Sequence, residues 1–120
     1  MTEANPFAAM MAMGQEWAKQ MEGMMPTMPA DAMENFFGKG LNPEGLDAKS
    51  RLLMTLMGLT IMGATAEAQI RLTVRHALEA GATEQEVAET IALSAMFGGA
   101  PYMAKAMELA KEVTEKDGDA

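Results

Sequence analysis

Residues 48–62 constrain the fold most, because this stretch has no polar face. After Arg51 its only polar residues are Thr55 and Thr60, and the rest are leucine, methionine, isoleucine and glycine. Asp47 stands where an N-cap would, so we expect a helix over 48–62. A helix that is apolar all round has to be covered all round. A chain of 120 residues offers few helices for that, so the stretch predicts assembly with further copies of the chain.

Five further stretches carry helix signals, and none alternates as a strand would. Thr83 and Glu86 have the spacing of a capping box, as do Asp31 and Glu34. Gly81 suits a left-handed C-cap. The expected helices cover residues 6–25, 32–37, 66–80, 83–97 and 101–114. After Glu89, the helix over 83–97 has almost only small or apolar residues, so we expect it at the centre. The pattern predicts an all-α fold, a compact bundle of about six helices.

The first expected helix carries an apolar seam, a row of residues spaced alternately three and four positions apart. The apolar seam consists of Phe7, Met10, Gly14, Trp17, Met21 and Met24. This spacing favours packing against another helix, but the repeat spans too few heptads to predict a coiled coil. We therefore interpret residues 1–40 as a Met-rich N-terminal helical arm, residues 41–116 as the helical domain and residues 117–120 as a disordered tail.

The arm has two readings that the sequence leaves open. It packs on its own protein or a symmetry mate, or it docks on another surface through residues 5–25. An anionic membrane is disfavoured, because the polar side offers Lys19 against Glu16 and Glu22. A protein groove or an uncharged hydrophobic surface fits better. The side chains that we expect to make this contact are Phe7, Met10, Trp17, Met21 and Met24.

Charge and composition exclude several functions. The net charge of −8 argues against a nucleic-acid partner. The chain has no cysteine, which excludes disulfides, thiolate catalysis and Cys-ligated metal sites. Met21, Met24, Met25 and Met28 resemble a thioether set for Cu(I), but no histidine or cysteine accompanies them and seam packing explains Met21 and Met24. We expect no metal and no cofactor.

The sequence also indicates where the chain is found. Its first residues lack the basic segment and long apolar core of a secretory signal. No run of about 18 apolar residues is present, so we expect no transmembrane segment. The expected location is the cytoplasm.

Arg71, Arg75 and His76 form the one candidate catalytic group. The two arginines lie one helical turn apart, a spacing at which two guanidinium groups can clamp a carboxylate. His76 lies beside them, and histidine is a residue type that can move a proton in catalysis. The alternative is a ladder of ion pairs, Glu67 with Arg71 and Arg75 with Glu79, at the favourable i,i+4 spacing.

Two stretches resemble the carboxymuconolactone decarboxylase family, which includes the alkylhydroperoxidase D-like proteins. They are LDAKSRLL at 46–53 and VRHALEAGATEQEVAETIALSAMFGGAP at 74–101. The resemblance covers roughly residues 44–110 and leaves the first 40 outside. It implies an all-α fold whose subunits assemble as trimers or hexamers.

The residues that carry the family's redox chemistry are missing from this chain. The redox branch uses a Cys-x-x-Cys pair, a histidine four residues after the second cysteine, and a glutamate on the preceding helix. Alignment on residues 75–81 puts Thr73 in the histidine position, and Leu52, Leu53 and Met54 stand where the glutamate would be. A peroxidase that cycles through a disulfide needs thiols, so this activity is rejected. The decarboxylase branch needs no cysteine, but His76 lies three residues past the matching position.

We therefore interpret the chain as a homo-oligomer of the carboxymuconolactone decarboxylase type without the thiol redox centre. It would be a binding, interaction or structural protein that works through its Met-rich N-terminal helix. The alternative is a non-thiol lyase that acts on a small carboxylated substrate with Arg71, Arg75 and His76.

Overall fold

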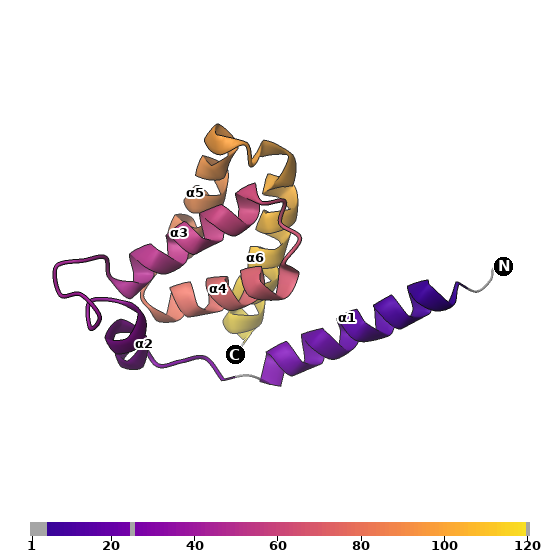
Figure 1. Cartoon of the computed structure of the whole chain (residues 1–120), viewed down its shortest axis with the longest axis horizontal. Helices are drawn as coiled ribbons and strands as arrows, with labels where there is room; N and C mark the ends of the chain where they lie inside the picture. Colours follow the sequence, from indigo (N-terminus) through magenta and orange to yellow (C-terminus); the bar gives the residue numbers. More distant parts are fainter. Residues whose placement is uncertain (1–4, 25, 120) are drawn as a thin grey trace.

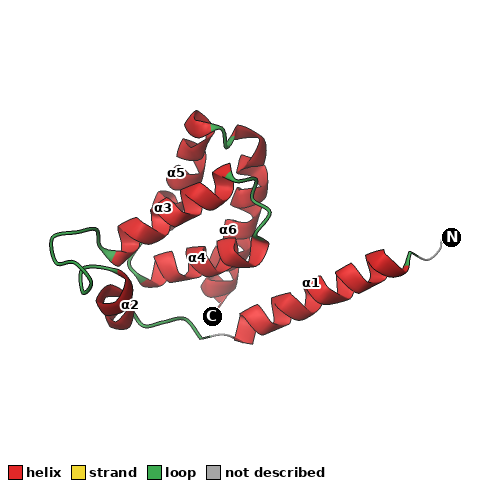
Figure 2. Cartoon of the chain, in the orientation of Figure 1, coloured by secondary structure: helices red, strands yellow, loops and turns green. Residues whose placement is uncertain are grey.

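The computed structural model describes residues 5–24 and 26–119, and these residues form helices and no strand (Figure 2). The elements are α1 (Pro6–Met24), α2 (Ala30–Phe37), α3 (Ala48–Ile61), α4 (Glu67–Glu79), α5 (Glu84–Leu93), the 3₁₀ turns η1 (Ser94–Phe97) and η2 (Ala100–Tyr102), and α6 (Met103–Asp119). The predicted all-α fold with six α-helices is confirmed over this part of the chain. Residues 1–4 of the arm, Met25 at the expected end of its helix, and Ala120 of the tail lie outside the described residues.

Helices α3 to α6 form the bundle, and α1 extends away from it (Figure 1). α3 and α4 pack along one another, and α5 and α6 pack across them. The centre is filled by apolar side chains from all four helices, among them Leu56, Ile70, Ile91 and Ala106, each with no exposed surface. Removing these side chains from water supplies the main stabilisation of the bundle.

The central helix is α4, and the prediction that residues 83–97 would be central is wrong. α4 packs against both α3 and α6, with Ile70, Val74 and Ala77 fully buried. In α5 the buried residues are Val87 and Ile91. The α-helix ends at Leu93 and continues as the 3₁₀ turn η1. The apolar residues of this second half lie largely on the surface of the single chain, so apolar composition alone misplaced the helix.

Three of the predicted helix ends are confirmed. The Asp47 side chain accepts a hydrogen bond from the Ser50 amide and caps α3. Thr83 and Glu86 form both hydrogen bonds of a capping box at the start of α5. Gly81 follows α4 with a φ of +106°, a left-handed conformation that glycine adopts without steric cost. Each of these signals acts within a few residues, so the local sequence was enough to predict it.

The predicted capping box at Asp31 and Glu34 is wrong. α2 begins at Ala30, and no side chain caps it. The Glu34 carboxylate instead accepts hydrogen bonds from the Lys39 amide at 2.6 Å and the Ala48 amide at 3.2 Å. Glu34 therefore ties the end of α2 to the start of α3, a contact that depends on the path of the loop between them.

The C-terminal helix runs further than the sequence indicated. The expected helix stopped at about Thr114, whereas α6 extends to Asp119. It therefore includes residues 117–119, which the sequence assigned to the tail. Its inner side is formed by Ala106, Leu109, Ala110 and Val113, all buried. This spacing of three and four residues keeps one side of the helix on the bundle.

Acid sensitivity tests the capping box. A hydrogen bond from the Thr83 amide, followed by one from the Lys49 ammonium at 3.2 Å, holds the pKa of the Glu86 carboxyl below its ordinary 4.5. A lowered folded-state pKa stabilises the fold above the unfolded value, and this contribution disappears as the pH falls through the folded value. We expect Glu86→Gln to flatten the loss of stability below about pH 4.5, measured by thermal unfolding from pH 7 to pH 3. An exposed control, Glu108→Gln, should keep the wild-type profile; an unchanged profile for Glu86→Gln would contradict the assignment.

Candidate functional site

Arg71 is the centre of the candidate site, and carboxylates from three helices surround it. Its side chain points from α4 into the junction of α1 and α6, and the residue is only 9% exposed. Nε donates to the two carboxylate oxygens of Glu22 at 2.9 and 3.1 Å. Nη1 lies 3.8 Å from Oε1 of Glu67 and 3.6 Å from Oε1 of Glu112. Arg71 therefore joins α1, α4 and α6.

Glu22 is the residue that Arg71 and Arg75 bind in this structure. It is buried near the end of α1, and Arg71 binds its carboxylate. Nη1 of Arg75 donates to the main-chain oxygen of the same residue at 3.2 Å, where a cation also complements the negative end of the helix dipole. The two arginines thus hold one residue of this chain, Arg71 by its carboxylate and Arg75 by its main-chain oxygen. Sequence reasoning missed it, because Glu22 lies 49 residues before Arg71 and no local pattern connects them.

The first of the two predicted ion pairs, Glu67 with Arg71, is confirmed. Glu67 and Arg71 form the expected i,i+4 pair, and Lys105 of α6 also reaches Glu67 at 3.1 Å. The charges therefore extend over α4 and α6 as a small network. Arg75, the start of the second expected pair, is directed to the end of α1 through its bond to the Glu22 oxygen.

The charge on Arg71 is secured by its surroundings. Burial disfavours the charged guanidinium, but the hydrogen bond and the charge of Glu22, with the charges of Glu112 and Glu67, outweigh it and raise the pKa of Arg71. A permanently charged group inside the protein needs a compensating charge at close range. Docking of α1 supplies that charge through Glu22.

A cavity of about 180 Å³ opens beside this ion pair. It is lined by Lys19, Glu22, Gly23, Arg71, Arg75, Glu112 and Val113. Within the described residues, Nη1 of Arg71 is buried and has no hydrogen-bond acceptor, although two carboxylates lie within 4 Å. A second hollow of about 400 Å³ lies between α1 and α4, where Gln15, Glu16 and Lys19 face Thr65 and Glu67. The polar side of α1 is therefore the side turned toward the bundle.

His76 is not among the residues that line the cavity with Arg71 and Arg75. Its Nδ1 lies 2.9 Å from the Leu72 carbonyl oxygen, and its Nε2 accepts from the Met28 amide at 3.1 Å. These partners assign the proton to Nδ1, because one ring nitrogen faces an acceptor and the other a donor. In this arrangement His76 fastens the segment between α1 and α2 to α4.

Two residues that the alignment on residues 75–81 placed at the family's catalytic positions are buried. They are Thr73 on α4 and Leu52 on α3. Among residues 5–24 and 26–119, no group of three His, Cys, Asp or Glu side chains could hold a metal ion. None of the described helices is long and apolar enough to cross a membrane.

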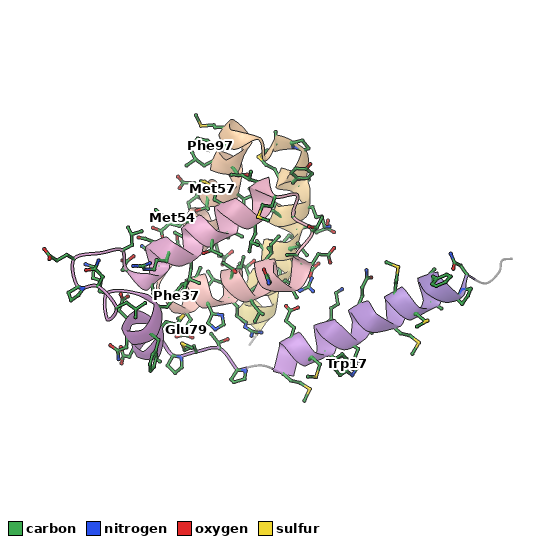
Figure 3. The ribbon with its side chains drawn as sticks, viewed as in Figure 1. Trp17, Phe37, Met54, Met57, Glu79 and Phe97 are labelled. Carbon is green, nitrogen blue, oxygen red and sulfur yellow. The ribbon has the colours of Figure 1, made fainter. Side chains whose placement is uncertain are left out.

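The apolar seam of α1 faces away from the bundle. Phe7 is 74% exposed and Trp17 is 64% exposed, and the three methionines of the seam are exposed as well. Figure 3 shows Trp17 on the side of α1 opposite the other helices. Since Glu22 is buried and the seam is not, α1 is docked by its polar side.

Removing the Glu22 carboxylate tests what holds α1. Hydrogen bonds to charged groups contribute about 1.5–3 kcal/mol, so Glu22→Ala should raise amide exchange in α1 by roughly 10- to 100-fold. Exchange in α3 and α5 should stay unchanged, because the bundle core does not include Glu22. Hydrogen–deuterium exchange read by mass spectrometry measures both. Glu16→Ala, a change at an exposed carboxylate of the same helix, is the control; equal exchange in the two variants would show that Glu22 does not hold α1.

The sequence and its relatives agree with this architecture. The carboxymuconolactone decarboxylase family matches residues 29–112, which include α2 and extend the resemblance drawn over 44–110 toward the N-terminus. An uncharacterized 15.0 kDa protein in the nqo9-nqo10 intergenic region of Paracoccus denitrificans is 50% identical to the chain, over 89% of each. No solved structure matches the chain significantly. With more than two thirds of its length in the family match, which includes α3, α4, α5 and the first part of α6, the chain belongs to the carboxymuconolactone decarboxylase family.

Proposed function

We propose that this family member is a homo-oligomeric binding or structural protein that works through α1 and not through thiol redox chemistry. The orientation of α1 carries the proposal. An amphipathic helix on its own domain normally turns its apolar side inward. α1 does the reverse: it buries Glu22 against Arg71 and presents its apolar seam.

The exposed seam needs a partner surface. Phe7, Met10, Trp17, Met21 and Met24 form a row of large apolar side chains in contact with water. Contiguous exposed apolar surface of this kind marks interaction sites in proteins. Methionine adapts its shape to the surface it meets, which suits a binding helix. A protein surface or another uncharged hydrophobic surface fits this seam.

Assembly with further copies is supported by a second exposed apolar surface. The outer side of α3 leaves Met54 57% exposed and Met57 half-buried, and Leu93, Met96 and Phe97 are exposed next to it. We call these five residues the α3–α5 face. α3 contacts both α5 and η1, and Figure 3 shows Met54, Met57 and Phe97 on the same side of the bundle. One chain therefore covers only part of the apolar surface of residues 48–62.

The polar residues of α4 support a binding role over a catalytic one. Both ring nitrogens of His76 face main-chain groups, at Leu72 and Met28. The guanidinium of Arg71 is held by Glu22. A general base needs a ring nitrogen free to reach a substrate proton, and in this arrangement His76 offers none.

A seam variant tests the proposed role of α1. Trp17→Glu places a charge in the middle of the seam without touching Glu22, so we expect it to lose the binding that α1 makes. The readouts are the sedimenting mass of the purified chain and the set of proteins that co-purify with it from its own cells. Ala8→Glu, an exposed position on the opposite side of the helix, is the matched control for one added negative charge on α1. If Trp17→Glu keeps both the mass and the co-purifying set of the wild type, α1 is not the interaction element.

A lyase that acts on a small carboxylated substrate is the second candidate, and one observation favours it. Arg71 lines the 180 Å³ cavity, and its buried Nη1 has no hydrogen-bond acceptor among residues 5–24 and 26–119. A guanidinium nitrogen in that state is suited to a carboxylate.

Succinate, as a plain dicarboxylate probe, separates the two candidates. The lyase predicts saturable binding by calorimetry that Lys19→Trp abolishes by filling the cavity from its exposed rim. It also predicts turnover of a small carboxylated substrate that His76→Ala removes. The binding role predicts that His76→Ala leaves assembly and capture unchanged. Absence of succinate binding in the wild type would count against the lyase.

A further inference from the structure

Two apolar surfaces on this chain lie on opposite sides of the bundle. The apolar seam belongs to α1, which packs against α4. The α3–α5 face lies across the bundle from α1 (Figure 1), and Figure 3 places Met54, Met57 and Phe97 along that far side while Trp17 lies beyond α4. Each surface is open to solvent in the single chain.

We propose that the apolar seam of α1 in one copy docks on the α3–α5 face of a second copy. The proposal rests on the proposed role of α1 as the binding element, and it names the surface that α1 binds. The contact is head-to-tail, because each copy gives one surface and receives the other. A contact of this type closes into a ring when the rotation between copies allows it.

The ion pair at the base of α1 explains why the two surfaces meet between copies and not within one. Arg71 and Arg75 hold Glu22 against α4, which fixes the side of α1 that faces the bundle. The seam is then directed outward, with α4 between it and the α3–α5 face of the same chain. A second copy can approach the seam from outside without disturbing the ion pair.

The two surfaces match in chemistry. Neither the seam nor the α3–α5 face contains a charged residue, and methionine contributes three residues to each. Since every copy carries a net charge of −8, copies repel one another, and an uncharged apolar contact is the arrangement that avoids adding to this repulsion.

The α3–α5 face offers a hollow beside it that can receive a large side chain of the seam. A hollow of about 350 Å³ lies at the edge of the α3–α5 face, lined by Glu89, Thr90, Ala92, Leu93 and Met96. Trp17 is the largest side chain of the seam, and buried aromatic anchors in such hollows dominate binding energies. α1, with 19 residues, is about 28 Å long at 1.5 Å per residue. A helix of that length can cross the face and contribute much of the roughly 800 Å² per partner of a stable interface.

Two single variants and their mixture test the proposal. Trp17→Glu damages the seam and leaves the α3–α5 face intact, whereas Met96→Glu does the opposite. Both residues are well exposed, so circular dichroism should show folded chains. In sedimentation velocity each variant alone should fall to the 12.8 kDa monomer. Their equimolar mixture should form a dimer, because the Met96→Glu chain offers an intact seam to the intact face of the Trp17→Glu chain.

The single tryptophan gives an independent readout. Trp17 is the only tryptophan, so all tryptophan emission reports on the seam. Titrating the Met96→Glu chain with the tryptophan-free Trp17→Glu chain should move the emission to shorter wavelength as Trp17 leaves water. Diluting the wild-type chain should move it the opposite way. Leu41→Glu, a change at an exposed leucine outside both surfaces, should keep the wild-type mass and emission.

Three outcomes would overturn the proposal. If Trp17→Glu stays assembled and Met96→Glu falls apart, copies meet face to face without α1. If both variants keep the wild-type mass, or the wild type is itself a monomer, neither surface joins copies. If neither surface joins copies but Trp17→Glu still loses the co-purifying proteins, α1 binds a foreign partner, and the proposed binding role of α1 stands without the contact between copies. A mixture that stays monomeric would show that the seam and the face do not bind each other.

Discussion

The ion pair between Glu22 and Arg71 decides how the N-terminal third of the molecule is arranged. The pair brings together residues 49 positions apart in the chain, and it sets one side of α1 against α4. Burying two charges costs desolvation energy, and close, hydrogen-bonded geometry has to offset it. Here Nε meets both carboxylate oxygens at about 3 Å, and Arg75 adds a bond to the Glu22 carbonyl. This contact sets which side of α1 faces the bundle and therefore leaves the apolar seam exposed.

α4 serves two purposes on two sides. Its apolar side, with Ile70 and Val74, forms the centre of the bundle. Its polar side holds the N-terminal segment at two points: Arg71 and Arg75 at the end of α1, and His76 at the Met28 amide. The arginines and the histidine that looked like a catalytic group are thus engaged with the protein itself. Because the same helix carries core and attachment, the position of α1 is coupled to the packing of the bundle.

The family fold persists here without the family's redox groups. The chain contains no thiol, and Thr73, which the alignment placed in the histidine position, is buried. The helical bundle depends on apolar burial and helix caps, so it can be retained after the reactive groups are lost. α1 lies outside the residues matched by the family. A role in binding and assembly, as proposed for α1, uses the fold as a rigid base for a helix.

The sequence by itself determined the helices, most of their ends and the family. Asp47 and Thr83 cap main-chain groups within a few residues, and Gly81 ends α4 by its own backbone conformation. The local sequence therefore predicts all three. The tertiary structure decided which surfaces face inward. It moved the centre of the bundle from residues 83–97 to α4, redirected Glu34 to the start of α3, and paired Arg71 with Glu22. Each of these depends on contacts between distant segments, whose energies are realised only after the chain has folded and brought them together.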